Sequence, residues 1–317
     1  MAGTDGPLVL GLDTSCYTTS AALAQNDEII GFQRMLLPVS MGERGLRQSE
    51  AVFAHLRQLP QVLEGLPDMA GALRAVCVSV KPRDGEDSYM PVFTAGASFA
   101  RAIGKAAGIP VFETTHQRGH IRAALWRSGL TGNSFLAAHL SGGTTEIMLM
   151  RDGAITSLGN GLDLHAGQLV DRIGVMLGLP FPCGPHLEEL ARRVGAPKAV
   201  LPASLDGGNC HFSGAEAALK RLYRGGMPPE DAAAEVYSVL TRTVLRMLEH
   251  ARDLTGETKV LLAGGVASSA LFREMLSERA GKRRSGLELY FGEPRLSSDN
   301  AFGVALLGCD MLRSVEE

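Results

Sequence analysis

The chain has 317 residues, of which 45% are hydrophobic and 21% charged, and its formal net charge is −3. This composition excludes a disordered chain, and the weak acidity excludes a protein that attracts nucleic acid through an overall positive field. The length suits two domains of ordinary size or one large domain. The 38 glycines exceed the usual share of about 7% and indicate many tight turns rather than a helical bundle.

The cysteines and the hydrophobic runs indicate in which cellular compartment we expect the protein. The five cysteines are widely spaced and form neither a CxxC pair nor a disulfide framework, so we expect a reduced, cytoplasmic protein. The first residues lack the pattern of a signal peptide, and no apolar run reaches about 18 residues, so we expect no membrane span. The one basic cluster, Lys282-Arg283-Arg284, favours a solvated surface turn; a nucleic-acid contact would need such a local patch or a partner subunit.

In chain order, a strand–turn–strand plan occurs twice. Residues 8–12 predict a buried strand, residues 13–20 a small polar turn, and a return strand follows. The plan recurs as a strand over 135–140, a polar turn over 141–145 and a return strand over 147–150. Thr14 and Ser141 are 127 positions apart, which is too long for a solenoid repeat and indicates two related domains.

Helical and strand patterns alternate around these two copies. We expect helices over residues 50–59, 94–107, 232–254 and 299–312, and further strands over residues 76–80, 111–112, 259–263 and 287–291. This alternation favours an α/β class with largely parallel pairing outside the hairpins.

His116 and His120 are four residues apart in Thr-Thr-His-Gln-Arg-Gly-His, a spacing that puts both imidazoles on one face of a helix. Together with a third ligand they could hold a divalent metal, although core histidines are the commoner case. Asp299, just before an apolar stretch, is either that third ligand or an N-cap. Such a ligand set suits iron or zinc, and Gln117 stands where a zinc protease needs a glutamate.

The two polar turns are candidate phosphate-binding loops. Thr14 and Ser15 in the first copy, and Ser141, Gly142 and Gly143 in the second, offer hydroxyl groups and unobstructed backbone N–H groups. Plain hairpin turns are the alternative. The pair is the stronger signal, because two opposed loops can grip one polyphosphate from both sides.

Two further segments suggest a nucleotide site. Gly264 and Gly265 end a strand and precede a helix, so they either admit a flat ligand and a phosphate at the helix N-terminus or serve packing alone. Asp171 could accept a hydrogen bond from a ribose hydroxyl, or form a surface salt bridge with Arg172 or another neighbour. The proline-rich turn at residues 180–185 could wall a nucleotide pocket.

Taken together, these segments resemble the TsaD (Gcp) family, the catalytic subunit of tRNA threonylcarbamoyladenosine synthase, formerly classed as a glycoprotease. The resemblance covers nearly the whole chain, and His-x-x-Gly-His with the late Asp-Asn is its most specific part. It implies an actin-like ATPase (ASKHA) fold, with two duplicated ribonuclease H-like domains and a cleft between them. The first would span residues 1–130 with a C-terminal helix at about 295–317, and the second residues 131–294.

The resemblance also implies a set of ligands and a reaction. A divalent metal would be bound by His116, His120 and Asp299, and ATP or an adenylate would be the nucleotide. Nucleotide contacts are implied for Ser141, Gly142, Gly143, Asp171, Gly184, Gly264, Gly265 and Ser269. The family transfers a threonylcarbamoyl group from its adenylate to N6 of adenosine 37 in tRNA, with the metal orienting the substrate and polarising its carbonyl. It works with an actin-like partner subunit, and a homodimer through the same surface is the other possibility.

The chain departs from the family's pattern at several polar positions. Tyr17, Thr144, Gln168, Glu216 and Ser269 stand where the family has an acid, His, Glu, Lys and Asn, respectively. The metal ligands and the glycines are retained. The sequence therefore leaves two functions open, a transferase of the family's kind and a non-catalytic paralogue that binds a nucleotide and a partner subunit. A sugar kinase would explain the two loops but not the histidine pair.

Overall fold

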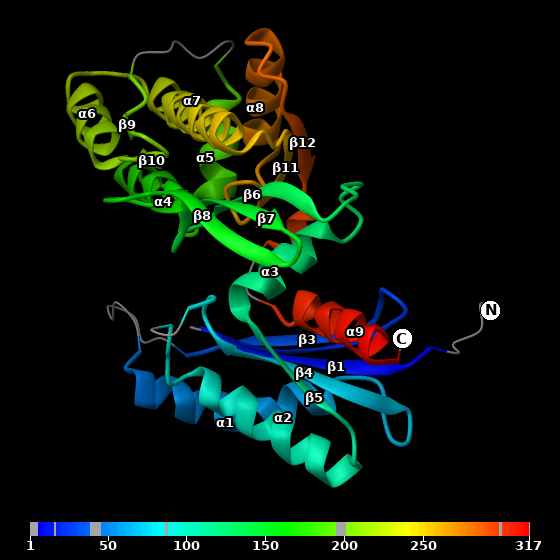
Figure 1. The fold of residues 1–317 in the computed structure, drawn as a ribbon. Helices are drawn as coiled ribbons and strands as arrows, with labels where there is room; N and C mark the ends of the chain where they lie inside the picture. The colour runs from blue at the N-terminus through cyan, green and yellow to red at the C-terminus, as the bar shows by residue number, and fades with distance from the viewer. Residues whose placement is uncertain are drawn as a thin grey trace. The chain divides into compact units, whose positions relative to one another are not determined.

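A computed structural model describes residues 6–15, 17–38, 46–85, 88–194, 201–297 and 300–316. The chain forms two compact units: Met1–Ala123 with Ser298–Glu317 is unit 1, and Ala124–Ser297 is unit 2. Each unit contains a five-stranded sheet and a hydrophobic core of its own (Figure 1). Within the described ranges, no helix is long and apolar enough to cross a membrane.

The sheet of unit 1 has the order β3-β2-β1-β4-β5. β1 (Leu8–Ser15), β2 (Thr18–Gln25) and β3 (Glu28–Leu36) form an antiparallel meander. β4 (Leu73–Lys81) and β5 (Val111–Thr115) continue the sheet in parallel. Every residue of β1 is buried, as expected for a central strand that is covered on both faces.

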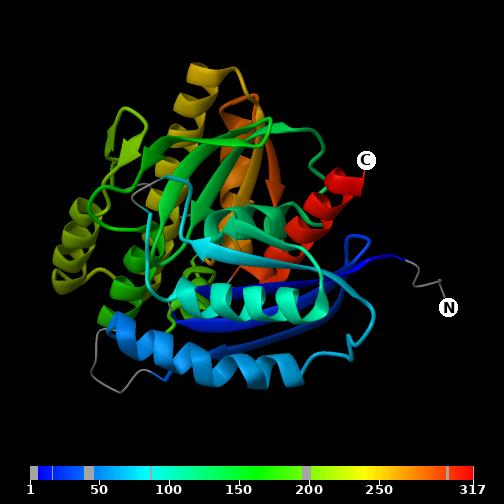
Figure 2. The ribbon, with the colours of Figure 1, turned by 60° about the horizontal axis from the view of Figure 1, so that its bottom comes forward.

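Helices cover both faces of this sheet. α1 (Gln48–Glu64) and α2 (Phe93–Ala107) pack on one face, where Figure 2 shows them side by side. α9 (Phe302–Glu316) packs on the other face, and α3 (His116–Leu125) directly follows β5. A side chain at Gly11 of β1 would collide with the backbone of α9, so glycine permits this close approach.

The sheet of unit 2 repeats the plan of unit 1. Its order is β12-β11-β6-β7-β8. β6 (Ser134–Leu140), β7 (Thr145–Arg151) and β8 (Ala154–Asn160) form the antiparallel meander. β11 (Lys259–Ala263) and β12 (Glu288–Phe291) add in parallel to β6. The two sheets therefore share one topology, as a duplicated unit requires.

The helices of unit 2 lie mainly between β8 and β11 in the chain. They are α4 (Ala166–Met176), α5 (Gly184–Ala191), α6 (Ser213–Arg224), α7 (Pro229–Thr255) and α8 (Ala270–Lys282). The remaining short elements are β9 (Leu205–Asp206), β10 (Asn209–Cys210) and the 3₁₀ helix η1 (Pro294–Leu296). α7 packs against α5, α8 and the sheet, and its central residues, such as Tyr237 and Leu240, are fully buried in the core.

The α/β class and the duplicated plan predicted from the sequence are confirmed. The extended polar turn expected over residues 13–20 is wrong, because β1 continues to Ser15 and β2 begins at Thr18. Its polar side chains are hydrogen-bonded inside the unit and do not need solvent. The last helix begins at Phe302. Asp299, proposed as its first residue, lies outside the described residues.

Candidate functional site

His116 and His120 lie on α3, which begins directly at the end of β5. Their Nε2 atoms are 2.9 Å apart, and the two rings meet edge to face. Two nitrogens on one tetrahedral zinc lie about 3.3 Å apart, given Zn–N bonds of about 2.0–2.1 Å. The pair therefore presents two imidazole nitrogens at nearly the separation that a shared metal needs, as the spacing in the sequence predicts.

Asp13, at the middle of unit 1, orients the first of these histidines. Its fully buried carboxylate lies 3.2 Å from Nδ1 of His116. Ser15 and Ser79 also donate hydrogen bonds to it. Burial opposes ionisation of Asp13, but its electrostatic interaction and hydrogen bond with His116 and the hydrogen bonds from the two serines together hold its pKa below the usual value. An ionised Asp13 keeps the proton of neutral His116 on Nδ1 and leaves Nε2 for a metal.

The third proposed ligand, Asp299, lies outside the described residues, but its neighbours in the chain pack on α3. Gly119, between the two histidines, is in close contact with Gly303 of α9, and a side chain at Gly119 would meet Val304 at 2.9 Å. In the described part of the chain, no group of three His, Cys, Asp or Glu residues could hold a metal ion. The separation of the two nitrogens fits a shared metal ion. The proposed third protein ligand is Asp299.

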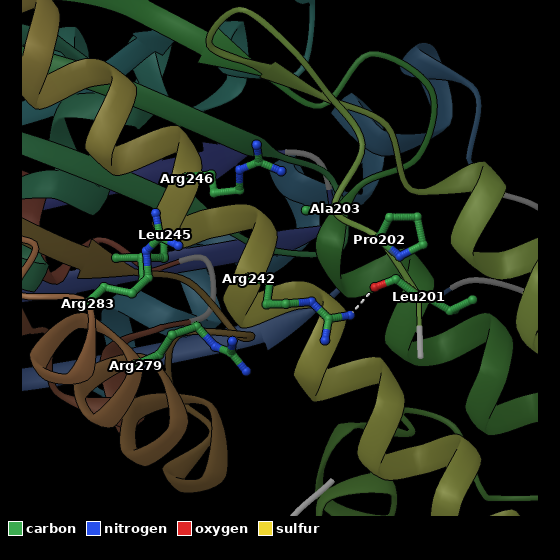
Figure 3. Close-up of a pocket in the computed structure, with 8 residues that line it drawn as sticks. All are labelled: Leu201, Pro202, Ala203, Arg242, Leu245, Arg246, Arg279 and Arg283. Atoms are coloured by element: carbon green, nitrogen blue, oxygen red, sulfur yellow. Dashed lines mark hydrogen bonds between the residues drawn. The ribbon is translucent and has the colours of Figure 1, made fainter. Parts of the chain in front are cut away.

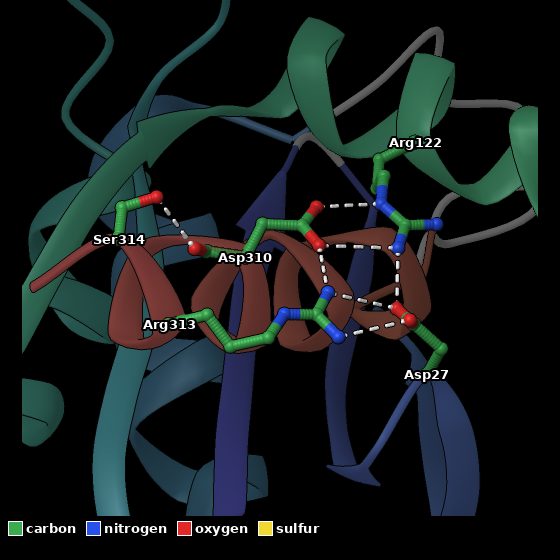
Figure 4. Close-up of polar contacts among 5 residues, drawn as sticks. All are labelled: Asp27, Arg122, Asp310, Arg313 and Ser314. Atoms are coloured by element: carbon green, nitrogen blue, oxygen red, sulfur yellow. Dashed lines mark hydrogen bonds and ion pairs between the residues drawn. The ribbon is translucent and has the colours of Figure 1, made fainter. Parts of the chain in front are cut away.

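A network of two arginines and two aspartates fixes α3 against α9 (Figure 4). Arg122 of α3 donates to Asp310 of α9 at 2.7 Å and to Asp27 of the β2–β3 turn at 2.7 Å. Arg313 bridges the same two carboxylates at 2.6–3.3 Å. The hydrogen bond from Arg313 and the charge of Arg122 keep the pKa of Asp27 low against its partial burial. The network thus holds α3, which carries the two histidines, against α9, which follows Asp299 in the chain.

A second site is a cavity of about 380 Å³ in unit 2. It brings together five of the residues proposed to contact a nucleotide, which are Gly142, Asp171, Gly184, Gly265 and Ser269. Pro182 and Pro185 of the proline-rich turn also line it, as the sequence analysis proposed for that turn.

The other three residues proposed to contact the nucleotide are Ser141, Gly143 and Gly264. They belong to turns next to this cavity. Gly264 has a φ of +96°, and a side chain there would collide with the carbonyl of Leu140. Ser141 Oγ accepts from the N–H groups of Gly143 and Thr144 at 3.3 and 3.1 Å. Ser141 therefore shapes the β6–β7 turn, while Gly142 and Gly143 are exposed at its tip.

Asp171 contributes a half-buried carboxylate to the cavity. Its Oδ1 accepts from the N–H of Cys183 at 3.0 Å. Burial raises its pKa, and the hydrogen bond from Cys183 opposes this rise. Arg172 pairs instead with Glu216 at 3.3 Å, so the salt bridge between Asp171 and Arg172 that the sequence left open is wrong. The second carboxylate oxygen of Asp171 suits a hydroxyl donor.

Glu188 is a cavity residue that the sequence analysis missed. Its carboxylate accepts from Ser269 Oγ at 2.7 Å and from the N–H of Leu271 at 2.9 Å, and Ser269 accepts from Phe272 N at 3.2 Å. Glu188 also pairs with Arg192 at 3.0 Å, and its carboxylate occupies the N-terminus of α8, where a phosphate would otherwise accept the same N–H groups. Glu188 lies 81 positions from Ser269, so no local pattern could have indicated this contact. Acceptor groups in this cavity suit the hydroxyl and amino groups of a nucleoside.

The first-copy loop candidates, Thr14 and Ser15, are fully buried. Thr14 Oγ1 donates to the carbonyl of Val92 at 3.0 Å and accepts from Gly96 N at 3.2 Å. Ser15 Oγ donates to Asp13 at 2.7 Å. Both hydroxyl groups serve the interior of unit 1, so a phosphate contact by them is not supported.

Two of the positions that depart from the family's pattern have structural partners of their own. Gln168 accepts from the N–H of His165 at 3.1 Å at the start of α4. Glu216 is buried and pairs with Lys220 at 2.5 Å and with Arg172 at 3.3 Å. These substitutions are therefore accommodated by the fold of unit 2.

Solved structures share this architecture. HypF of T. kodakarensis superimposes with a TM-score of 0.61 at 14% sequence identity, covering 98% of this chain and 48% of that chain. A ROK family glucokinase of Streptomyces griseus, solved with glucose and AMPPNP, superimposes with a TM-score of 0.54 at 12% identity, covering 96% of this chain and 99% of that chain. The duplicated sheets and these similarities define an actin-like ATPase fold.

The sequence comparisons identify the family. The model of the TsaD family, tRNA N6-adenosine threonylcarbamoyltransferase, matches residues 54–306. A tRNA N6-adenosine threonylcarbamoyltransferase of Aromatoleum aromaticum is 31% identical over 320 residues, 95% of this chain and 90% of that protein. The chain belongs to the TsaD family.

Some relatives are considerably longer than this chain. A probable bifunctional tRNA threonylcarbamoyladenosine biosynthesis protein of Thermoplasma volcanium is 27% identical over 311 residues. The match covers 97% of this chain but only 57% of that protein. The chain thus spans little more than half the length of this relative.

Proposed function

We propose that the chain is a metal- and nucleotide-binding transferase that moves a threonylcarbamoyl group from its adenylate to N6 of adenosine 37 in tRNA. The observation that carries this proposal is the Asp13–His116–His120 arrangement, in which two imidazole nitrogens converge and a buried carboxylate fixes one ring. A sugar kinase would have no use for this arrangement. The proposal includes an actin-like partner subunit or a second copy of this chain.

The metal would be held by Nε2 of His116, Nε2 of His120 and the carboxylate of Asp299, with iron or zinc as the ion. When bound, it supplies a Lewis acid that polarises the carbonyl to be transferred. Asp13 keeps the ring of His116 in one orientation and one tautomer. The network around Arg122 supports the same helix from its other end.

The nucleotide would occupy the cavity of unit 2. Asp171, whose Oδ1 accepts from Cys183, offers its second carboxylate oxygen to a ribose hydroxyl or to the adenine amino group. Gly142, exposed at the tip of the β6–β7 turn, offers its backbone N–H group to a phosphate. Gly265 leaves room for a flat ring beside the backbone, because nothing lies within 4 Å of the side chain it lacks.

A non-catalytic role in binding a nucleotide and a partner subunit is the second candidate function. The observation that favours it is Glu216, an acid where the family pattern has a lysine. Its charge is neutralised by Arg172 and Lys220. That position therefore provides no cation for a negatively charged substrate.

Elemental analysis of the purified protein tests the metal first. We expect one iron or zinc per chain in the wild type, loss of this metal in His116→Ala and His120→Ala, and retention in His186→Ala, whose histidine is exposed on α5. A wild type without stoichiometric metal would contradict the proposed site.

Reconstitution with threonylcarbamoyl-adenylate, a candidate tRNA and accessory proteins tests the reaction. We expect modified adenosine with the wild type and only background with His116→Ala. A metal-loaded wild type that produces no modified adenosine would exclude the transferase and leave the non-catalytic candidate, which calorimetry with ATP and AMP tests separately.

A further inference from the structure

Four arginines surround a cavity of about 530 Å³ on the helical side of unit 2 (Figure 3). Arg242 and Arg246 lie one turn apart on α7, and Arg279 and Arg283 lie one turn apart at the end of α8. Like charges at this spacing repel one another. Since α7 packs against α8, the fold brings two such pairs to one place.

Two of the four arginines are neutralised by acids outside the cavity lining. Arg242 pairs at 2.9 Å with the buried carboxylate of Glu235. Arg283 makes a two-pronged contact with Glu249 at 2.9 and 3.0 Å.

The other two arginines, Arg246 and Arg279, have no ion pair or side-chain hydrogen bond among the residues that the structure describes. The rest of the lining is Leu201, Pro202, Ala203 and Leu245. The cavity lining therefore includes no acid among the residues that the structure describes.

Arg279 is the least satisfied of the four. Its Nε atom is buried and has no hydrogen-bond partner among the described residues. Burial, and then the charges of Arg242 and Arg283, lower the pKa of Arg279, while Glu278 and Glu235 offset only part of this effect. Leaving a buried donor of a charged group unpaired is costly, and an anion in the cavity would remove that cost.

The surroundings favour a compact anion over an extended one. The neighbouring cavity, which shares Arg279 and Arg283, is also lined by Glu274 and Glu278. These two acids pair with Arg192 and Lys282 of the same lining, so the described residues there add no uncompensated cation for a nucleic-acid backbone that continued past the arginines. The arginine cavity also shares no lining residue with the proposed nucleotide cavity, so it is a separate site within unit 2.

We propose that this cavity, here called the arginine cavity, binds a small phosphate anion of high charge, of the pyrophosphate class. Guanidinium groups bind phosphate oxygens through pairs of parallel hydrogen bonds, and several of them can share one diphosphate. Arg246 and Arg279 supply the uncompensated charge, and Arg242 and Arg283 shape the remaining wall.

Calorimetry of the full chain with inorganic pyrophosphate tests the site. We expect Arg279→Gln and Arg246→Gln each to weaken binding by about tenfold or more. Arg221→Gln is the matched control, because Arg221 is an exposed arginine of α6 that lies outside the cavity. It should bind pyrophosphate like the wild type.

Thermal unfolding separates a binding role from a structural one. Pyrophosphate should raise the Tm of the wild type and of Arg221→Gln, but not that of Arg279→Gln. Without the anion, Arg279→Gln should unfold at the same or a higher temperature than the wild type, because its substitution relieves repulsion.

Three results would overturn the proposal. One is the absence of binding by the wild type at millimolar pyrophosphate. Another is equal binding by the wild type, Arg246→Gln and Arg279→Gln, which would place the anion elsewhere, such as in the nucleotide cavity. The third is tighter binding of a single-stranded RNA oligonucleotide than of pyrophosphate, lost in the same variants, which would make the four arginines a nucleic-acid surface.

Discussion

The turn between β1 and β2 and the turn between β6 and β7 occupy equivalent places in two sheets of one topology, yet they differ in length. In unit 1, Ser15 pairs with Thr18, so the two strands are separated by only two positions in the sequence. In unit 2, Leu140 pairs with Thr145, so four residues form it. The longer turn leaves Gly142 and Gly143 exposed, whereas the polar residues at the end of β1 are buried within the strand.

The polar groups of the two turns therefore differ in what they contact. At the end of β1, Asp13, Ser15 and His116 satisfy one another in the interior of unit 1. At the end of β6, backbone N–H groups lie beside a cavity in unit 2. One duplicated plan thus supplies an imidazole oriented by a buried carboxylate in the first unit and an exposed turn in the second. Substitutions at the two places should differ in whether they affect stability or binding.

The largest expected effect is that of Asp13→Ala. It removes a buried carboxylate and leaves Ser15, Ser79 and His116 without their acceptor. We expect the free energy of unfolding to fall by about 3–5 kcal/mol, measured by urea denaturation. Asp171→Ala in unit 2 removes one hydrogen bond at the edge of a cavity and should cost only about 1 kcal/mol. Equal losses in the two variants would refute the distinction between the sites.

The interior of unit 1 should also make the protein sensitive to acid. His55 is fully buried, its Nδ1 lies 2.8 Å from Thr19 Oγ1, and burial lowers its pKa to about 4. Its pKa is lower in the folded than in the unfolded state, so stability is lost as the pH falls from about 6.5 to 4. The loss should approach about 3 kcal/mol, at 1.36 kcal/mol per pKa unit.

Urea denaturation of the wild type and of His55→Asn between pH 7 and 4 checks this expectation. Asparagine keeps a donor for Thr19 but does not titrate, so its curve of stability against pH should be flatter. Parallel curves for the two proteins would show that His55 is not the titrating group.

The smallest effects should distinguish the hydroxyl groups of the two turns. Thr14→Val removes the hydrogen bond to Val92 and should reduce the free energy of unfolding by about 1 kcal/mol, with nucleotide binding unchanged. Ser141→Ala frees the exposed β6–β7 turn and should weaken nucleotide binding severalfold with less effect on stability. Calorimetry with ATP measures nucleotide binding by both variants, and urea denaturation measures their stability. If Thr14→Val weakened binding and Ser141→Ala mainly reduced stability, the proposal that the β6–β7 turn contacts the nucleotide would be contradicted.

Features that depend on residues close together in the sequence could be predicted, whereas contacts between residues far apart in the sequence could not. The pairing of His116 with His120 follows from helical spacing, and the duplicated sheets follow from two runs of similar pattern. The contact of Asp13 with His116 spans 103 positions, and that of Glu188 with Ser269 spans 81. No local rule reports such contacts, which depend on the completed fold.

The incorrect prediction of a turn over residues 13–20 has a related cause. Small polar residues there resemble a loop in the sequence, because hydroxyl and carboxylate groups normally require water. In unit 1 these groups find partners in β4 and α3, such as Ser79 and His116, and the chain can remain a strand. These long-range partners make Asp13 a candidate for orienting a metal ligand. They also explain why the sequence pattern did not predict that Asp13 lies in a strand.

The close packing of α9 on β1 has a consequence for biosynthesis. Unit 2 is one continuous segment, whereas unit 1 needs a helix that follows unit 2 in the chain. Gly11 lies against the backbone of Ala305, so β1 is translated almost three hundred positions before the helix that covers it. During translation unit 2 can therefore complete its core while the sheet of unit 1 still has one face uncovered, and that face is where a chaperone would be needed most.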